Sequence, residues 1–242
     1  MNATEISPGL VIQGFIPPLK LSDFKLIAFD MDSTLINIEC IDEIADAAGR
    51  KAEVAAITEA AMRGEITDFK DSLRRRLALL KGVSVVSMEA VYKDRLQINP
   101  GAKELIDACK VAGMKVLLVS GGFTFFADKV QKTLGIDDVK ANALEVKDGK
   151  LTGKLMTQSW GDICDGEEKR RTVLSVCHDL GITPKQVIAM GDGANDLPMM
   201  HLCAEAGGLS VAYLAKPKVR KEAMVSITSG GLDRLLSAFV TE

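Results

Sequence analysis

The sequence predicts an α/β fold, a doubly wound and mostly parallel sheet with an inserted helical cap subdomain. Short apolar runs that end in small or acidic residues recur at Leu26–Phe29, Lys115–Val119 and Gln186–Met190. Helix-like stretches follow these runs, which is the alternation expected of parallel strands joined by crossover helices. One interval between two runs, residues 39–97, carries only helical patterns. We therefore expect it to be an insertion into the alternating core.

These changes of pattern predict the domain boundaries. Residues 1–24 show no clear period and form an N-terminal leader to which we assign no function. Residues 25–38 and 98–242 form the α/β core domain, and residues 39–97 form the helical cap. Glycines separate the expected cap helices, which are Ile41–Ala48, Ala52–Met62, Thr67–Leu80 and Val85–Asp94. The other elements expected in the core are helices at Ala102–Val111, Glu167–Leu180, from about Asn195 and at Leu232–Phe239, a strand at Leu209–Tyr213, and a hairpin of Asn142–Val146 with Lys150–Leu155.

The overall composition excludes several classes of protein. The net charge is −3, so no general basic character indicates a nucleic-acid partner. No apolar run approaches a membrane span, and the first residues lack the basic region of a secretory signal. The five cysteines are scattered and form no C-x-x-C pair, which predicts free thiols and a cytoplasmic location. With only two histidines, a catalytic metal is expected to be a hard cation on oxygen ligands.

The first apolar strand ends in Asp30, Asp32 and Thr34. A calcium loop starting at Asp30 would need glycine where Leu35 stands and glutamate where Ile41 stands, so that interpretation fails. A plain acidic turn remains open. In the catalytic interpretation, Asp30 attacks an electrophile such as phosphorus, and Asp32 serves as acid and base. Two carboxylates so close together repel each other, which calls for a cation beside them.

Two later strand ends carry complementary groups. Asp192, in a Gly-Asp-Gly turn, can join Asp30 and the Asp32 carbonyl as the oxygen ligands that Mg²⁺ prefers. A helix-capping turn is the alternative for that stretch alone. Ser120, Gly121 and the following glycine offer a hydroxyl and free N–H groups that suit an anion, without the spacing of a nucleotide P-loop. Because the ends of parallel strands meet at one sheet edge, we expect the three ends to converge.

One arginine lies on the apolar side of the expected cap helix from Thr67. The apolar stripe of that helix consists of Phe69, Leu73, Leu77 and Leu80. Arg76 falls in the middle of the stripe, whereas Arg74 and Arg75 point away. A buried arginine needs a partner, which is either an internal salt bridge or the carboxylate of a substrate.

Four more residues keep two interpretations each. Glu39 is either an ordinary acid at a helix start or the acceptor of a substrate ammonium group. Met62 and Phe69 are either simple core or the apolar lining of a site. Lys169 lies in the run Glu-Glu-Lys-Arg-Arg, and composition alone favours a solvated face for it.

Taken together, these motifs resemble those of haloacid dehalogenase-type phosphatases. The matching positions, in chain order, are Asp30-x-Asp32-x-Thr34, Ser120-Gly121-Gly122, Lys169 and Gly191-Asp192-Gly-Ala-Asn195-Asp196. The neighbouring segments 38–44 and 61–65 are similar to the branch of that family that hydrolyses O-phospho-L-serine. The resemblance covers about residues 25–234 and implies the Rossmann-like core and helical cap of this family.

The resemblance implies a role for each matching residue. Asp30 would be the phosphorylated nucleophile and Asp32 the general acid and base. Asp30, Asp192 and the backbone of Asp32 would hold Mg²⁺. The residues that would bind the phosphate and the amino acid are Ser120, Gly121, Lys169, Asn195, Glu39, Arg76, Met62 and Phe69. Thr34 and Asp196 would support this site.

The implied activity is Mg²⁺-dependent hydrolysis of a small substrate, O-phospho-L-serine, through an aspartyl-phosphate, as the last step of serine biosynthesis. One alternative is the same chemistry on another small phosphate, or phosphate transfer to homoserine. A dehalogenase is disfavoured, because Asp32 would then have no leaving oxygen to protonate. A non-catalytic phospho-receiver or binding module would not need Asp32 as an acid.

About two dozen residues precede the first strand, so we expect no regulatory domain before it.

Overall fold

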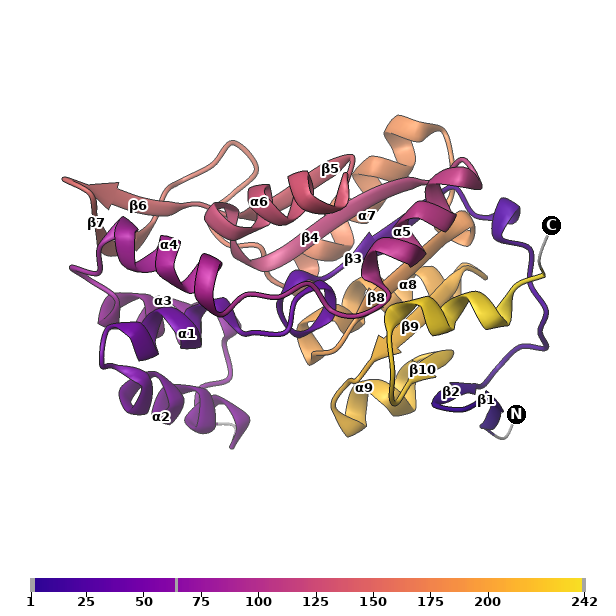
Figure 1. Cartoon of the computed structure of the whole chain (residues 1–242), viewed down its shortest axis with the longest axis horizontal. Helices are drawn as coiled ribbons and strands as arrows, with labels where there is room; N and C mark the ends of the chain where they lie inside the picture. Colours follow the sequence, from indigo (N-terminus) through magenta and orange to yellow (C-terminus); the bar gives the residue numbers. More distant parts are fainter. Residues whose placement is uncertain (1–2, 64, 241–242) are drawn as a thin grey trace.

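The computed structural model of the chain describes residues 3–63 and 65–240, without the side chain of Met62. An eight-stranded sheet runs through the core in the order β1-β2-β10-β9-β8-β3-β4-β5 (Figure 1). Its strands are β1 (Thr4–Ser7), β2 (Leu10–Ile12), β3 (Leu26–Phe29), β4 (Lys115–Phe123), β5 (Asp138–Asn142), β8 (Val187–Gly191), β9 (Leu209–Tyr213) and β10 (Val225–Ile227). From β10 to β5 all neighbouring strands are parallel, which confirms the expected fold class.

Strand β3 lies at the centre of the parallel part. It pairs with β4 on one side and β8 on the other, so that Phe29 faces Leu118 and Met190 in register. All four residues of β3 are buried, as expected for a strand covered on both faces. This register brings the residues that follow β3, β4 and β8 to the same edge of the sheet.

Helices cover both faces of the sheet. On one face, helices α5 (Ala102–Val111) and α6 (Thr124–Leu134) pack with Ile27 and Phe29. On the other face, α7 (Gly166–Leu180), α8 (Leu197–Glu205) and α9 (Pro217–Glu222) pack with the alternate residues of the same strand. None of the helices in the described part of the chain is long and apolar enough to cross a membrane.

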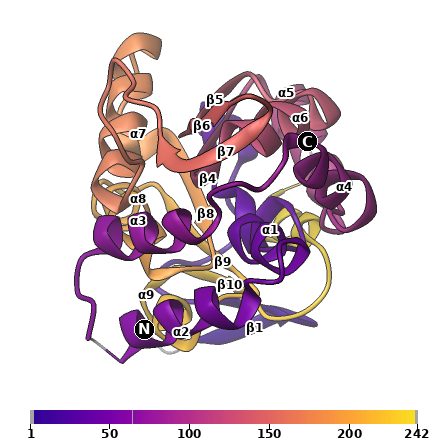
Figure 2. The ribbon, with the colours of Figure 1, turned by 90° about the vertical axis from the view of Figure 1, so that its left-hand side faces the viewer.

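Four helices between β3 and β4 lie at one end of the molecule, away from both termini (Figure 1), and this end faces the viewer in Figure 2. They are α1 (Cys40–Ala47), α2 (Lys51–Met62), α3 (Phe69–Leu79) and α4 (Val85–Asp94). The hairpin of β6 (Leu144–Lys147) and β7 (Lys150–Leu155) joins this end through a hydrogen bond from Leu151 N to Val83 O of 2.8 Å. These helices occupy the residues expected to form a cap, and we propose the cap and core division on that basis.

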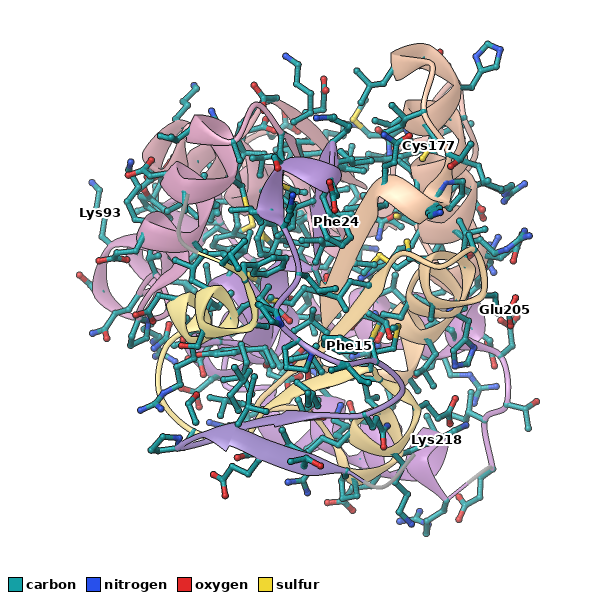
Figure 3. The ribbon with its side chains drawn as sticks, turned by 90° about the vertical axis from the view of Figure 1, so that its right-hand side faces the viewer. Phe15, Phe24, Lys93, Cys177, Glu205 and Lys218 are labelled. Atoms are coloured by element: carbon teal, nitrogen blue, oxygen red, sulfur yellow. The ribbon has the colours of Figure 1, made fainter. Side chains whose placement is uncertain are left out.

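Parts of the outer sheet differ from the sequence prediction. The first residues form β1 and β2, which extend the sheet antiparallel to β10. From there the chain crosses the end of the molecule opposite the cap, where Phe15 and Phe24 lie (Figure 3). Strands β5 and β10 were not predicted, whereas the helix expected at Leu232–Phe239 is present as a 3-10 helix over Leu232–Ala238. Strand β10 has only three residues, and β5 carries the polar residues Asp138, Lys140 and Asn142, so neither shows an apolar run like that of β3. Their pairing with distant segments stabilises them.

Candidate active site

The three strand ends converge under the cap helices. They line a cavity of about 970 Å³ together with residues of α1, α2 and α3. The sequence-predicted residues that line it are Asp30, Asp32, Glu39, Phe69, Arg76, Ser120, Gly121, Asp192 and Asn195. The ends of β3, β4 and β8 therefore meet at one edge of the sheet, as the parallel register of these strands requires.

Asp30 follows β3 directly and is almost completely buried. Its backbone N–H donates to Met190 O of β8 at 3.0 Å, which continues the strand pairing to the site. Its Oδ1 accepts from the N–H of Met31 at 2.7 Å and lies 2.7 Å from Lys169 Nζ. These contacts fix one carboxylate oxygen of Asp30.

Lys169 is completely buried between two carboxylates. Its Nζ lies 2.7 Å from Asp30 Oδ1 and 2.6 Å from Asp196 Oδ1. Burial by itself lowers the pKa of Lys169, but the charges of Asp196 and Asp30 outweigh it and raise the pKa above the ordinary value. The solvated interpretation that composition favoured is wrong for Lys169, although it holds for the exposed neighbour Arg171.

Asp196 holds the turn that follows β8. Its Oδ2 accepts the backbone N–H groups of Asp192 at 3.1 Å and Gly193 at 3.0 Å. A Cβ atom on Gly191 would lie 2.3 Å from the Asp196 carboxyl carbon, so only glycine permits this close approach. The carboxylate of Asp196 thus connects the Asp192 turn to Lys169.

A cluster of buried carboxylates beside the cavity, two of which line it, suits a divalent cation. Oxygens of Asp30, Asp192 and Asp196 lie within 4.8 Å of one another. Both oxygens of Asp196 already accept hydrogen bonds, which leaves Asp30 and Asp192 as the better ligands. Burial and the charge of Asp196 raise the pKa of Asp30 to about 7 despite Lys169. Burial and the charge of Asp30 raise the pKa of Asp192 to about 8. A bound cation would relieve this repulsion.

Asp32 lies in the turn Met31–Leu35, where Ser33 has a left-handed φ of 57°. Its Oδ2 accepts the N–H of Cys40, the first residue of α1, at 3.1 Å. Its Oδ1 is buried and has no hydrogen-bond partner in the described part of the chain. Burial, followed by the charges of Glu39 and Asp30, raises the pKa of Asp32 well above its ordinary value. A protonated carboxyl with a free oxygen at the cavity can act as an acid.

The end of β4 runs between Asp32 and the cap. Ser120 is completely buried, and its Oγ accepts the N–H of Gly122 at 2.9 Å. A Cβ atom on Gly122 would lie 3.3 Å from Asp32 Oδ2, and one on Gly121 would lie 3.3 Å from the ring of Phe69. The glycines therefore let the backbone itself face the cavity.

The cap contributes Arg76 and the three acids Glu39, Asp42 and Asp68 to the cavity. Arg76 forms no ion pair within the described residues, and its buried Nε has no hydrogen-bond partner among them. Burial lowers its pKa, and the charges of Asp42 and Glu39 oppose that shift. Glu39 accepts a hydrogen bond from Ser33 Oγ at 2.7 Å. The internal salt bridge considered for Arg76 is absent from the described part, which leaves the guanidinium available to a ligand.

Some predicted residues lie elsewhere. Thr34 is buried outside the cavity lining, and its Oγ1 has no hydrogen-bond partner in the described residues. The side chain of Met62 lies outside what the structure describes. Sequence reasoning missed Ser33, Asp42 and Lys216 as lining residues. Lys216 comes from the loop after β9, and no local pattern connects it to the first strand.

Residues 27–201 match the family model of haloacid dehalogenase-like hydrolases. The chain therefore belongs to the haloacid dehalogenase-like hydrolase family.

Its relatives include phosphoserine phosphatases. It is 71% identical to the phosphoserine phosphatase of Polaromonas sp. over 98% of each chain. It is 67% identical to that of Albidiferax ferrireducens over 99% of each chain. A substrate-bound phosphoserine phosphatase structure aligns with a TM-score of 0.79 at 39% identity, over 90% of this chain and 99% of the other. A structure of a phospho-aspartyl intermediate analogue of phosphoserine phosphatase aligns with a TM-score of 0.80 at 39% identity and the same coverage.

Proposed function

We propose that this chain is a Mg²⁺-dependent phosphoserine phosphatase that hydrolyses O-phospho-L-serine to L-serine and phosphate. One observation carries the proposal. A single cavity is lined by Asp30, which pairs with the buried Lys169, by Asp32 and by Arg76. Within the described residues, Asp32 Oδ1 has no hydrogen-bond partner and the Arg76 guanidinium forms no ion pair. Phosphoryl chemistry on one side of the cavity and a carboxylate receptor on the other suit a phosphorylated amino acid. The full-length similarity to phosphoserine phosphatases supports the same assignment.

The first chemical step belongs to Asp30. Its Oδ1 is held by Lys169 and by the N–H of Met31, so the second oxygen can attack phosphorus. The P–O bond to the seryl oxygen breaks as the bond from Asp30 to phosphorus forms. In the proposed step Asp32, whose pKa burial raises, gives a proton to that oxygen, and L-serine leaves.

The second step returns the enzyme to its starting state. Asp32, now ionised, accepts a proton from a water molecule, and the oxygen of that water attacks phosphorus. Phosphate leaves, and Asp30 is free again. Lys169 and the N–H groups at the end of β4 offset negative charge on the transferring group, which is usually the largest contribution to such catalysis.

Mg²⁺ fits the proposed site, because its buried ligands are oxygens and Asp30 and Asp192 repel each other without a cation. Asp30 and Asp192 would hold it, with the Asp32 carbonyl proposed as a further ligand. When bound, the ion would neutralise charge on the phosphate oxygens.

The cap side of the cavity would select the amino acid. Arg76 would bind the substrate carboxylate, and Glu39 the ammonium group. Ser120, Gly121 and Asn195 would contact the phosphate, and Phe69 the serine methylene. The scattered and buried free cysteines support a cytoplasmic location.

Phosphate release from L-phosphoserine, O-phospho-L-threonine and p-nitrophenyl phosphate tests this proposal, with Mg²⁺ and then with EDTA. We expect metal-dependent turnover that strongly favours phosphoserine and that the Asp30→Asn variant loses. Turnover of p-nitrophenyl phosphate but not phosphoserine would keep the phosphatase and discard the substrate. A stable phosphorylated Asp30 without turnover would favour a phospho-receiver, and product phosphohomoserine in the presence of homoserine would favour a phosphotransferase.

A further inference from the structure

Asn142, the last residue of β5, connects two parts of the proposed phosphate site. It is completely buried. Its Nδ2 donates to the carbonyl oxygen of Gly121 at 2.7 Å, and its Oδ1 accepts the N–H of Cys164 at 2.7 Å. Gly121 lies at the end of β4, and Cys164 precedes α7, the helix that carries Lys169. One side chain thus fastens the phosphate-binding backbone to the segment that presents the buried lysine.

The two backbone partners fix the orientation of the amide. A carbonyl oxygen needs a donor and an N–H needs an acceptor, so only one of the two amide orientations of Asn142 satisfies both. The groups are buried, and leaving either without a partner carries a desolvation cost. A side chain of this length must therefore donate and accept at once.

The contact to Gly121 also fixes the direction of the next N–H group. The Gly121–Gly122 peptide is planar and trans, so its carbonyl and N–H point in opposite directions. Because the carbonyl points to Asn142, the N–H points away from it, toward Ser120 Oγ at 2.9 Å. Gly122 itself lies beside Asp32, whose Oδ2 is 3.3 Å from the place of a Cβ atom on this glycine.

We propose that Asn142 is a positioning residue for phosphate binding. It holds the Gly121–Gly122 peptide so that its N–H donates to Ser120 Oγ, which fixes the hydroxyl of this cavity-lining serine, and it keeps this peptide in register with the helix of Lys169. The inference rests on the proposed function, because it takes the end of β4 as the phosphate site. Asn142 does not line the cavity, so its effect on phosphate passes through the backbone it holds.

The Asn142→Asp variant tests the donor requirement without changing the shape of the side chain. In its protonated form the new carboxyl donates to Gly121 O and accepts from Cys164 N, as the amide does. In its ionised form it has no donor and repels the carbonyl. Burial raises the pKa of such a carboxyl, which brings its titration into a measurable range.

The readout is the dissociation constant of inorganic phosphate at saturating Mg²⁺, measured by calorimetry from pH 5.5 to 8.5 and expressed as variant over wild type. At the upper end of this pH range, we expect Asn142→Asp to bind phosphate roughly 10- to 100-fold more weakly than the wild type, as the loss of a buried hydrogen bond predicts. This ratio should shrink toward one as the pH falls. Asn142→Ala should weaken binding at every pH.

Gln158→Ala is the matched control. Gln158 Nε2 donates to Ala141 O at 3.3 Å, next to Asn142, but the side chain lines no part of the cavity. The phosphate affinity of the Gln158→Ala variant should equal that of the wild type. A pH-independent ratio for Asn142→Asp, or wild-type affinity in Asn142→Ala, would overturn the proposal.

An experiment on the wild-type chain keeps the test independent of variant folding. Addition of phosphate should shift the Gly122 amide resonance, because the acceptor of this N–H, Ser120 Oγ, belongs to a residue that lines the cavity, and an unchanged resonance at saturation contradicts the proposed path from Asn142 through this peptide to the phosphate. Phosphate binding does not depend on which ester is hydrolysed. Wild-type protein that binds phosphate but does not turn over phosphoserine would therefore remove the substrate assignment and leave the role of Asn142 standing.

Discussion

The ammonium group of Lys169 lies 2.7 Å from Asp30 Oδ1, and at most 6% of either side chain is exposed. A charge at this depth is stable only with paired partners, and Asp196 completes the pairing. The same contact orients the carboxylate that we propose as the nucleophile. Stability and catalysis therefore depend on one buried cation.

Replacement of this cation should damage both properties. Lys169→Met leaves Asp30 and Asp196 facing each other without compensation. We expect turnover to fall by about 10³-fold or more, because an electrostatic stabiliser is lost. The free energy of unfolding should fall by about 3–5 kcal/mol where both carboxylates are ionised. Denaturant unfolding at several pH values measures the change in the free energy of unfolding, and phosphate release measures the change in turnover. Arg170→Met, on the exposed side of the same helix, should change neither quantity appreciably, and an equal loss there would contradict the explanation.

The raised pKa values of Asp30 and Asp192 predict a pH-dependent stability. Their ordinary value of 3.8 becomes about 7 and about 8 in the fold. At pH values between 3.8 and the raised pKa of each group, the folded chain therefore binds more protons than the unfolded chain. The stability contributed by these groups is present below pH 3.8 and is lost as the pH rises through 7 and 8. Without metal, the thermal midpoint should decrease across this range.

Mg²⁺ should reverse that trend, since it binds the deprotonated carboxylates. Its affinity should rise from pH 6 to pH 8, with a release of about one to two protons per ion. Calorimetric titrations in two buffers of different ionisation enthalpy measure the protons released. Affinity that is independent of pH, with no proton release, would show that these carboxylates are ionised before the metal binds.

Asp32→Asn separates the two proposed steps. The amide cannot give a proton to a seryl oxygen, so turnover of phosphoserine should fall by about 10²- to 10⁴-fold. p-Nitrophenolate needs no proton to leave, so the first step should survive with p-nitrophenyl phosphate. We expect a burst of nitrophenol equal to the enzyme concentration, followed by slow turnover. Rapid steady turnover without a burst would argue against Asp32 as the base of the second step.

Arg76→Ala tests the selection of the substrate. A guanidinium that binds a carboxylate in a partly buried site contributes about 2–5 kcal/mol, so kcat/KM for phosphoserine should fall roughly 30-fold or more. Phosphoethanolamine lacks that carboxylate, and its slower hydrolysis should be unaffected. Arg75→Ala is the control, since Arg75 is exposed and pairs with Asp71 one turn away. Equal losses for both substrates would show that Arg76 acts on the fold.

Sequence patterns alone predicted the features that local periodicity encodes. Apolar runs followed by helices indicated the parallel core, and the first run placed Asp30 and Asp32 at a strand end. The spacing of Leu73 and Leu77 placed Arg76 on the inner side of its helix, where the structure has it at the cavity. These inferences succeed because neighbouring residues set helical and strand periods.

The tertiary structure alone decided which polar groups meet. Nothing in the charged run around Lys169 distinguishes a buried cation from a solvated one until the fold brings Asp30, which follows β3, and Asp196, which follows β8, into contact with it. The sequence placed Asn142 only at the start of the expected hairpin and indicated no role for its side chain, because the partners of that side chain are the backbone of distant segments. The sequence by itself determined the fold class and the residues that can do chemistry. Burial and long-range pairing determined their charge states, because both depend on contacts that no local pattern records.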